Sequence, residues 1–355
     1  MKKRIVLALS TVIVAVVFAA CNVGGLATNP PASDTGNSQV RETVTVTDSN
    51  GNQVEITPNP TTVAIFDYGV LDMIYRVGFE RTGIELLIVP TKETLPDEFA
   101  YFANQSNDRV ITGGTLFYVD WDVLDLVQPD LVILGARSFG MNAAGNRLNT
   151  EERVDFVNST LERYGGTEFL FLAHNAQVAQ QLVDMQRNVD ALALVFPQLA
   201  DDLNRYMNDI RAQFAEIYTT VSEGEYRALF VSTGSPTNMS VFLRNSRYGM
   251  IYDEFGFFPV QDEEIEWTDQ HGFDTRAEFV LETNPDVIFL LDRSEVVGTG
   301  AGSDNFLGDP IIQMTEAYQN GHIYTLNGVP WYTITVGFTG AEAMINDINR
   351  FLEAR

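Results

Sequence analysis

The sequence has one cysteine, Cys21, and only three histidines in 355 residues. A single cysteine cannot close a disulfide within the chain, so the stability of the fold must come from a packed apolar core. The hydrophobic share of 45% is sufficient for such a core. A chain of this length folds more often as two domains than as one.

The short motifs that carry most catalytic chemistry are also missing. The sequence contains no Gly-x-Ser-x-Gly, no His-Glu-x-x-His, no Walker loop and no Gly-x-Gly-x-x-Gly at the start of a helix. A hydrolase would need a nucleophile with its base, paired carboxylates or an open metal site. We therefore expect a protein that is not an enzyme and that carries no intrinsic cofactor.

Basic residues are few, with 22 Lys and Arg against 48 Asp and Glu and a net charge of −26. Such a surface repels nucleic acid and anionic lipid, so no nucleic-acid partner is expected. Against this acidic background, several arginines that converge on one place would be a local exception. They would indicate a ligand with negative charge.

The first 20 residues combine a basic start with an apolar run, which is the pattern of a secretory signal peptide and not of a spanning helix. Cys21 comes directly after this run and resembles the cysteine of the bacterial lipobox, which becomes the lipid-modified first residue of the mature protein. Phe18, three residues before this cysteine, departs from the leucine that is usual in the lipobox. Residues 21–40, rich in Gly, Asn, Pro, Ser and Thr, are expected to form a flexible tether. The chain is therefore predicted to be anchored by lipid at the outer face of the cell membrane.

Two segments share a pattern around which the rest of the chain is organised. Residues 128–137 and 284–293 each begin with a Pro-Asp turn, continue as an apolar run and place an arginine at the same offset from the proline. An apolar strand that follows a helix is typical of a parallel sheet covered on both faces. Ligands of such sheets bind beyond the carboxyl ends of the strands. Arg137 and Arg293 are therefore predicted to face a ligand site from the two halves of the chain.

Strand and helix patterns alternate through the rest of the sequence, except for a helical section with apolar residues at three- and four-residue intervals. The predicted fold is α/β, with two Rossmann-like lobes of mostly parallel sheet joined by a long connecting helix. The chain is expected to consist, in order, of a signal peptide at 1–20, the tether at 21–40, an N-terminal lobe at 41–174, a helical connector at 175–222 and a C-terminal lobe at 223–355.

Three further residues of the second lobe complete a candidate site. Arg247 lies in a loop before a helix, His271 lies in a polar loop, and Tyr332 follows the strand predicted at 322–326. Three guanidinium groups suit a ligand with several negative oxygens. An imidazole and a phenolate suit a hard trivalent metal whose coordination sphere is incomplete. This set of residues indicates binding and no reaction.

In these residues the chain resembles the iron-siderophore-binding lipoproteins of bacterial ABC importers, in the branch that binds ferric catecholates. The resemblance covers residues 42–354 and is densest at 246–253, at His271-Gly272, at 284–293 and at Trp331-Tyr332. It implies the class III periplasmic-binding-protein fold, with a cleft between two lobes. The acidic run at 262–266 and Gly328-Val329-Pro330 before Tyr332 depart from the family pattern.

The same resemblance implies what the site residues do. Arg137, Arg247 and Arg293 would surround an Fe(III)-siderophore complex, and His271 and Tyr332 would complete the iron octahedron of a tetradentate siderophore. The implied partners are this complex and the permease subunits of an ABC transporter, with the binding protein as a monomer. A haem or corrinoid receptor of the same fold is the alternative. A lipid-anchored hydrolase is disfavoured by the missing motifs, and a sensor by the lack of a spanning helix.

Overall fold

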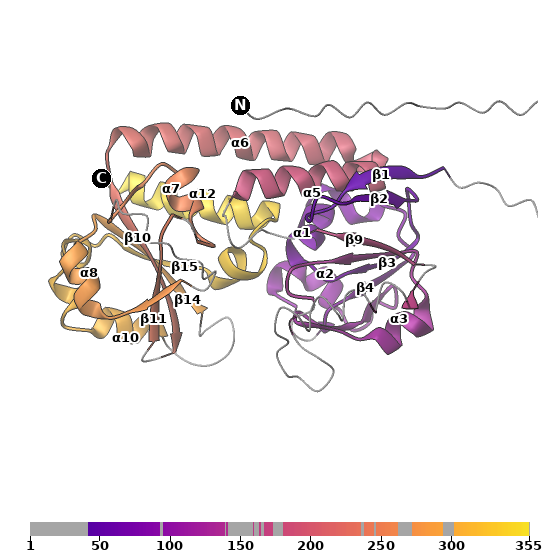
Figure 1. Cartoon of the computed structure of the whole chain (residues 1–355), viewed down its shortest axis with the longest axis horizontal. Coiled ribbons are helices and arrows are strands. Elements are labelled where there is room, and N and C mark those ends of the chain that lie inside the picture. Colours follow the sequence, from indigo (N-terminus) through magenta and orange to yellow (C-terminus); the bar gives the residue numbers. More distant parts are fainter. Residues whose placement is uncertain are drawn as a thin grey trace, which may run out of the picture. The chain divides into compact units, whose positions relative to one another are not determined.

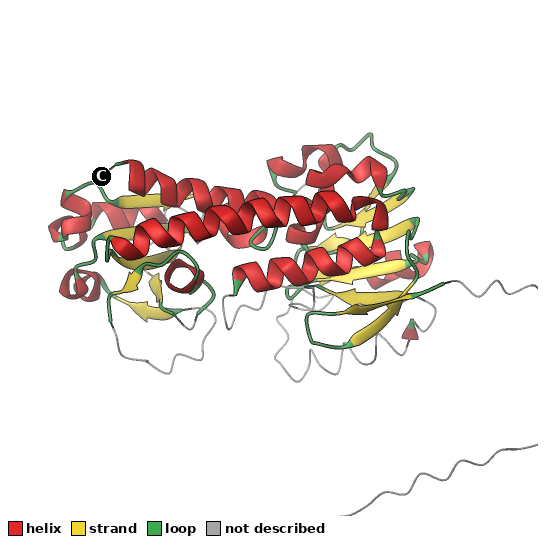
Figure 2. Cartoon of the chain, turned by 90° about the horizontal axis from the view of Figure 1, so that it is seen from above, coloured by secondary structure: helices red, strands yellow, loops and turns green. Residues whose placement is uncertain are grey.

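The computed structural model describes residues 42–354 with several internal gaps (Figures 1 and 2). The gaps are residues 93–94, 139, 141–158, 160–162, 165–166, 173–179, 236–237, 245, 262–271 and 294–301. The predicted signal peptide and tether, Cys21 and His271 lie outside the described residues. Most of a helix that the sequence pattern predicts at about 150–164 lies outside them too.

The first lobe is built on a five-stranded sheet with the order β5-β4-β3-β8-β9. All neighbouring pairs in it are parallel. Its strands are β3 (Thr62–Ile65), β4 (Leu86–Val89), β5 (Val110–Thr112), β8 (Leu131–Leu134) and β9 (Glu168–Phe171). Leu131 to Leu134 are all buried, which explains why this strand reads as an unbroken apolar run.

Two hairpins stand beside this sheet. β1 (Val44–Thr47) and β2 (Gln53–Ile56) pair antiparallel, and Gly51 in their turn takes a φ of +81°, which a residue with a side chain rarely adopts. The hairpin of β6 (Gly114–Thr115) and β7 (Tyr118–Val119) was not predicted. Its two-residue strands are too short to show an alternating pattern.

Helices connect the strands of the first lobe. α1 (Tyr68–Gly78) begins where the Asp67 side chain accepts hydrogen bonds from the amides of Gly69 (2.9 Å) and Val70 (3.1 Å). The Asp120 side chain caps the start of α3 (Trp121–Val127) in the same way, because it accepts hydrogen bonds from the amides of Asp122 and Val123. The other helical elements of this lobe are η1 (Phe79–Arg81), η3 (Asp97–Phe99) and α2 (Ala100–Ala103).

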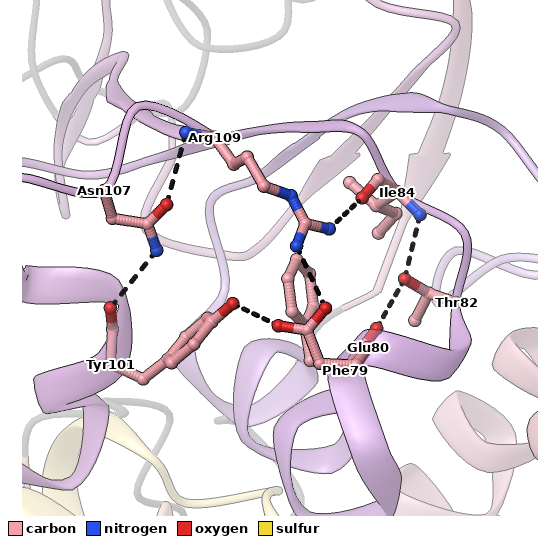
Figure 3. A network of polar contacts seen from close by, with 7 residues as sticks. All are labelled: Phe79, Glu80, Thr82, Ile84, Tyr101, Asn107 and Arg109. Carbon is pink, nitrogen blue, oxygen red and sulfur yellow. Dashed lines mark hydrogen bonds and ion pairs between the residues drawn. The ribbon is translucent and has the colours of Figure 1, made fainter.

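A polar network ties η1 to the edge of the first sheet (Figure 3). The guanidinium of Arg109, just before β5, donates to Glu80 at 2.9 Å, and the hydroxyl of Tyr101 donates to the other oxygen of the same carboxylate. The bonds from Tyr101 and Arg109 lower the pKa of Glu80. Because Glu80 is exposed, this network orients the loop more than it stabilises the fold.

The connector consists of two helices separated by η4 (Pro197–Leu199). α5 (Gln181–Val195) packs against β1, whereas the longer α6 (Ala200–Glu223) packs against α1 and against α12 (Phe338–Glu353) at the end of the chain. α6 therefore joins the two lobes and α5 belongs with the first. Figure 1 labels α6, the long helix that runs along both lobes.

The second lobe contains the sheet β13-β11-β10-β14-β15, with β12 paired to β10 outside this path. β10, β14 and β15 are parallel, but β11 is antiparallel to β10 and to β13, so the sheet is less parallel than the first. The reason is local: β11 begins three residues after β10 ends, and so short a connection can join only antiparallel strands. The strands are β10 (Arg227–Ser235), β11 (Asn238–Phe242), β12 (Phe258–Pro259), β13 (Phe273–Thr275), β14 (Val287–Asp292) and β15 (Ile323–Leu326).

The second lobe contains two helical elements that the sequence pattern does not predict. α10 (Gly302–Gly308) and the five-residue π-helix η6 (Val329–Thr333) gave no signal in the sequence. The other elements are α7 (Met250–Asp253), α8 (Ala277–Thr283), η5 (Ile312–Met314), α11 (Glu316–Gln319) and α12.

Charged side chains fasten the first lobe to α12. Asp72 of α1 is 1% exposed and accepts hydrogen bonds from the amide (2.8 Å) and the hydroxyl (2.6 Å) of Thr339. One turn further along α1, Arg76 donates twice to the carboxylate of Glu342, at 2.7 and 2.9 Å. Burial raises the pKa of Asp72 to about 6 although the bonds from Thr339 oppose this effect. A Cβ on Gly337 would lie 2.6 Å from an Asp72 oxygen, so the approach requires glycine there.

A hydrogen bond to Glu254 joins α5 to the second lobe. Glu254, which follows α7, accepts a hydrogen bond from the Leu182 amide at 3.0 Å in the first turn of α5. Burial raises the pKa of Glu254 to about 7, and its other oxygen has no hydrogen-bond partner among the described residues.

The predicted fold class is confirmed: two α/β lobes with largely parallel central strands are joined by the long helix α6. The two lobes belong to one compact unit, Arg41–Arg355. The boundaries expected near residues 174 and 222 stay a prediction.

Candidate ligand-binding site

Four of the five residues predicted to contact the ligand or its metal lie together. The guanidinium carbons of Arg137, Arg247 and Arg293 are 4.8, 5.5 and 5.5 Å from the centre of the Tyr332 ring. Arg137 comes from the first lobe and the other three from the second, so the cluster joins the two lobes. The fifth residue, His271, lies outside the described residues.

Arg137 is positioned by a tight turn after β8. The Gly135 amide donates to the hydroxyl of Ser138 (2.9 Å), and the Ser138 amide donates back to the Gly135 carbonyl (3.1 Å). A Cβ on Gly135 would lie 2.4 Å from Asp67 Oδ2, so a larger residue here would have to displace the Asp67 side chain. The turn brings Arg137 close enough to donate a hydrogen bond to the backbone carbonyl of Tyr332, 195 residues away in the chain.

Arg293 follows β14 directly, as the repeated strand pattern predicts, and its Nε lies 3.4 Å from the hydroxyl of Tyr332. Arg247 lies in the turn before α7, next to Tyr248, whose ring stacks on Phe230 with a centroid distance of 3.9 Å. Tyr248 is 1% exposed, so this stack fixes the backbone from which Arg247 extends. The arginines at 137 and 293 both come from carboxyl ends of parallel strands, where α/β sheets place their ligand sites.

Tyr332 lies in the π-helix η6, an irregularity that is frequent at functional sites. The neighbouring Trp331 is fully buried and donates from Nε1 to Asp347 of α12 at 2.8 Å, which anchors the π-helix. Trp331 is therefore a core residue. Tyr332 itself is 7% exposed.

The charges around Tyr332 perturb its ionisation. Burial raises the pKa of Tyr332, but the guanidinium groups of Arg137, Arg293 and Arg247 outweigh this effect and lower the pKa to about 8. Burial and the nearby charge of Arg247 lower the pKa of Arg137. The phenol is thus closer to ionisation near neutral pH than an ordinary tyrosine.

In the described part of the chain, none of the three arginines forms an ion pair with a carboxylate. The buried Nε of Arg247 has no hydrogen-bond partner there. Three guanidinium groups that form no ion pair among the described residues, in a protein of net charge −26, form a strong local site for an anion.

Sequence reasoning missed two residues beside Arg137. Asp67 and Tyr68 follow β3, the neighbour of β8 in the first sheet, and both act electrostatically on Arg137 or are acted on by it. Burial raises the pKa of Tyr68 to about 12. Their place at the carboxyl end of a central strand was a signal that could have identified them.

Among the described residues, no three His, Cys, Asp or Glu side chains gather as a metal site, and no helix has the length and apolar character needed to span a membrane.

Comparisons with known proteins give consistent matches. A family model described as "Periplasmic binding protein" matches residues 63–330. The petrobactin-binding protein YclQ of Bacillus subtilis is 25% identical over 351 residues, which cover 99% of each chain. The ferric-anguibactin-binding protein FatB of Vibrio anguillarum is 23% identical over 314 residues, covering 87% of this chain and 88% of that one. The crystal structure of the periplasmic catecholate-siderophore binding protein VctP from Vibrio cholerae matches with a TM-score of 0.71 and 25% identity, covering 87% of this chain and 100% of that one.

Proposed function

The chain belongs to the periplasmic binding protein family, and from this premise we propose that it captures a ferric siderophore of the catecholate type outside the cytoplasm. It then delivers this complex to the permease subunits of an ABC importer. It binds and releases its ligand without converting it, so it is not an enzyme and the iron complex is its cargo. The relatives named for siderophore complexes support this ligand class.

The single observation that carries the proposal is the group of three arginines around Tyr332, none of which forms an ion pair among the described residues. A ferric complex of catecholates has a compact shape and several negative oxygens, which match the fixed donors of guanidinium groups. A neutral or cationic ligand would leave three buried or half-buried positive charges without a partner, which is costly.

The expected affinity follows from the number of contacts. Each hydrogen bond to a charged group contributes about 1.5–3 kcal/mol. Three such contacts, together with packing against the ring, are sufficient for binding below about 1 μM, which requires about 8 kcal/mol. The long-range repulsion from the acidic surface is screened beyond roughly 8 Å in physiological salt.

Tyr332 and His271 are proposed as iron ligands when the siderophore itself supplies only four donor atoms. Phenolate oxygen and imidazole nitrogen both bind ferric iron. The lowered pKa of Tyr332 supports its part of this role, because less free energy is needed to form the phenolate. The part of His271 rests on the family resemblance alone.

The remaining features of the proposal concern the placement of the protein. A signal peptide at residues 1–20 directs export, and lipid on Cys21 holds the mature protein at the outer face of the membrane through the tether at 21–40. The mature protein acts as a monomer, since one chain contains both lobes and all the predicted ligand-binding residues.

Titration with ferric catecholate complexes tests this function, with quenching of protein fluorescence as the readout. Arg137→Ala and Arg293→Ala should each weaken binding by about 10- to 100-fold, since one charge-assisted contact is lost. Arg205→Ala is the matched control, because Arg205 also lies over a tyrosine ring, at 5.1 Å from Tyr206, but away from the site. Unchanged affinity in both site variants would contradict the site assignment. Binding of haemin or a corrinoid in preference to the ferric complex would contradict the ligand class.

A further inference from the structure

Tyr332 is the one residue that all three site arginines share. Their guanidinium carbons lie 4.8 to 5.5 Å from its ring centre. In the described part of the chain no other ring lies beside three guanidinium groups, although Tyr206 lies beside two, those of Arg76 and Arg205. Arg76 and Arg205 each also have an acidic partner, whereas the arginines around Tyr332 have none among the described residues.

Three cations that form no ion pair with a described carboxylate repel one another, although Asp67 offsets part of the charge of Arg137. Contacts within the protein must therefore hold the three side chains together before a ligand arrives. The hydrogen bonds that Arg137 and Arg293 make in the described part of the chain both end on Tyr332, one on its backbone carbonyl and one on its hydroxyl. Arg247 contacts Tyr332 only through the ring. The negative face of an aromatic ring attracts guanidinium groups, most strongly where water is excluded, and Tyr332 is 7% exposed.

The ring is itself held in place independently of any ligand. Trp331 is fully buried and bonded to Asp347 of α12, and the hydroxyl of Thr333 donates to the Val329 carbonyl at 2.8 Å within the π-helix. The Tyr332 ring is therefore more rigid than the long arginine side chains that lie against it. A rigid base that fixes flexible side chains reduces the entropy lost on binding.

We infer that the aromatic ring of Tyr332 is a positioning element that arranges Arg137, Arg247 and Arg293 for an anionic ligand before the ligand binds. This inference rests on the proposed function and deepens it, because it separates two roles of one residue. The ring organises all three arginines for every anionic complex. The hydroxyl adds one long contact to Arg293, at 3.4 Å, and has a larger part only where iron has an open coordination position. The chain should therefore tolerate loss of the hydroxyl far better than loss of the ring when the iron is already fully coordinated.

The experiment compares Tyr332→Phe with Tyr332→Leu in the lipid-free mature chain, titrated calorimetrically with a ferric hexadentate tris-catecholate complex. Such a complex leaves no coordination position for the tyrosine oxygen. Tyr332→Phe should bind within about threefold of the unmodified protein, and Tyr332→Leu should bind at least about 30-fold more weakly, since the cation–π contacts are lost. The bond from Arg137 to the backbone carbonyl survives in both variants, so some affinity remains.

Tyr324→Leu is the matched control. Tyr324 lies in the second lobe and is also 7% exposed. The guanidinium carbon of Arg350 lies 5.5 Å from the centre of its ring. This variant loses the same packing volume in the same lobe and should keep its affinity within about threefold, because it touches none of the site arginines. If Tyr332→Leu fails to fold, Tyr332→Met takes its place, since the flexible thioether fills the volume without an aromatic face.

A readout without ligand separates this inference from the proposed function. The Nε–H signals of the site arginines, assigned by NMR through single arginine variants, should be dispersed in the unmodified protein and in Tyr332→Phe. They should collapse toward the position of free arginine in Tyr332→Leu. If the unmodified protein binds no ferric catecholate, the proposed ligand is wrong and the NMR comparison still decides the inference. Equal affinity or unchanged arginine signals in Tyr332→Leu would overturn it, and so would a loss in Tyr332→Phe as large as that in Tyr332→Leu.

Discussion

Ionisation of Tyr332 provides a measurement of the arginine cluster that needs no ligand. Its pKa is lowered from 10.0 to about 8, against the effect of burial. The ultraviolet absorbance of phenolate follows this step, and subtraction of the titration of Tyr332→Phe isolates it from the other tyrosines. The difference titration should show one group with a midpoint near 8.

The magnitude of the effect of each arginine can be worked out from this pKa. A fall from 10.0 to about 8 corresponds to about 2.7 kcal/mol in favour of the phenolate. Because burial opposes this fall, the three guanidinium groups together supply more than the net value, or at least about 0.9 kcal/mol each if they share it equally. Removal of one of them should therefore raise the midpoint by at least about 0.7 pH unit.

Arg137→Ala and Arg293→Ala are the decisive variants, since Arg137 and then Arg293 have the largest lowering effects. Arg205→Ala, distant from the cluster, should leave the midpoint unchanged. A midpoint at or above 10 in the unmodified protein would refute the arrangement of the cluster. A midpoint near 8 that neither site variant moves would refute its electrostatic cause.

Two further predictions concern the framework of the site. Glu254→Gln should raise the free energy of unfolding by up to about 2–3 kcal/mol at about pH 8.5 and change it little at about pH 5. The pKa of Glu254 is raised from 4.5 to about 7, so its contribution is fully present below 4.5 and is lost as the pH rises through 7. Denaturant unfolding at both pH values measures this difference, and an effect independent of pH would contradict it. Gly135→Ala should cost about 1–3 kcal/mol and weaken ligand binding, because the new methyl group meets Asp67 Oδ2 at 2.4 Å. Gly308→Ala, where nothing lies within 4 Å, is its control in thermal unfolding, and equal midpoints for the two variants would show that the turn adjusts without strain.

The convergence of Arg137 and Arg293 could be predicted from the sequence for a simple physical reason. Each follows an apolar strand at the same offset, and the carboxyl ends of central parallel strands are where such sheets carry their sites. The α/β alternation and the helical connector could also be predicted from the sequence, because they depend on periodic apolar residues. Arg247 follows no such rule and came from the family resemblance alone.

The place of Tyr332 at the centre of the three arginines could not be predicted from the sequence. It depends on the π-helix η6, which has no local sequence signal, and on a hydrogen bond from Arg137 that joins residues far apart in the chain. The contact of Glu254 with α5 is likewise a tertiary contact that no periodicity encodes. The antiparallel direction of β11 could not be predicted either, because the pattern of apolar residues is the same in parallel and antiparallel strands.

The most direct test of the central claim is a native mass spectrum of the mature protein after incubation with a panel of ferric siderophores, haemin and a corrinoid. Binding by the three arginines predicts a complex of one protein with one anionic ferric catecholate, lost in a variant that combines Arg137→Ala, Arg247→Ala and Arg293→Ala. A spectrum with haemin or the corrinoid bound in its place, or with the ferric complex retained by the triple variant, would contradict the claim.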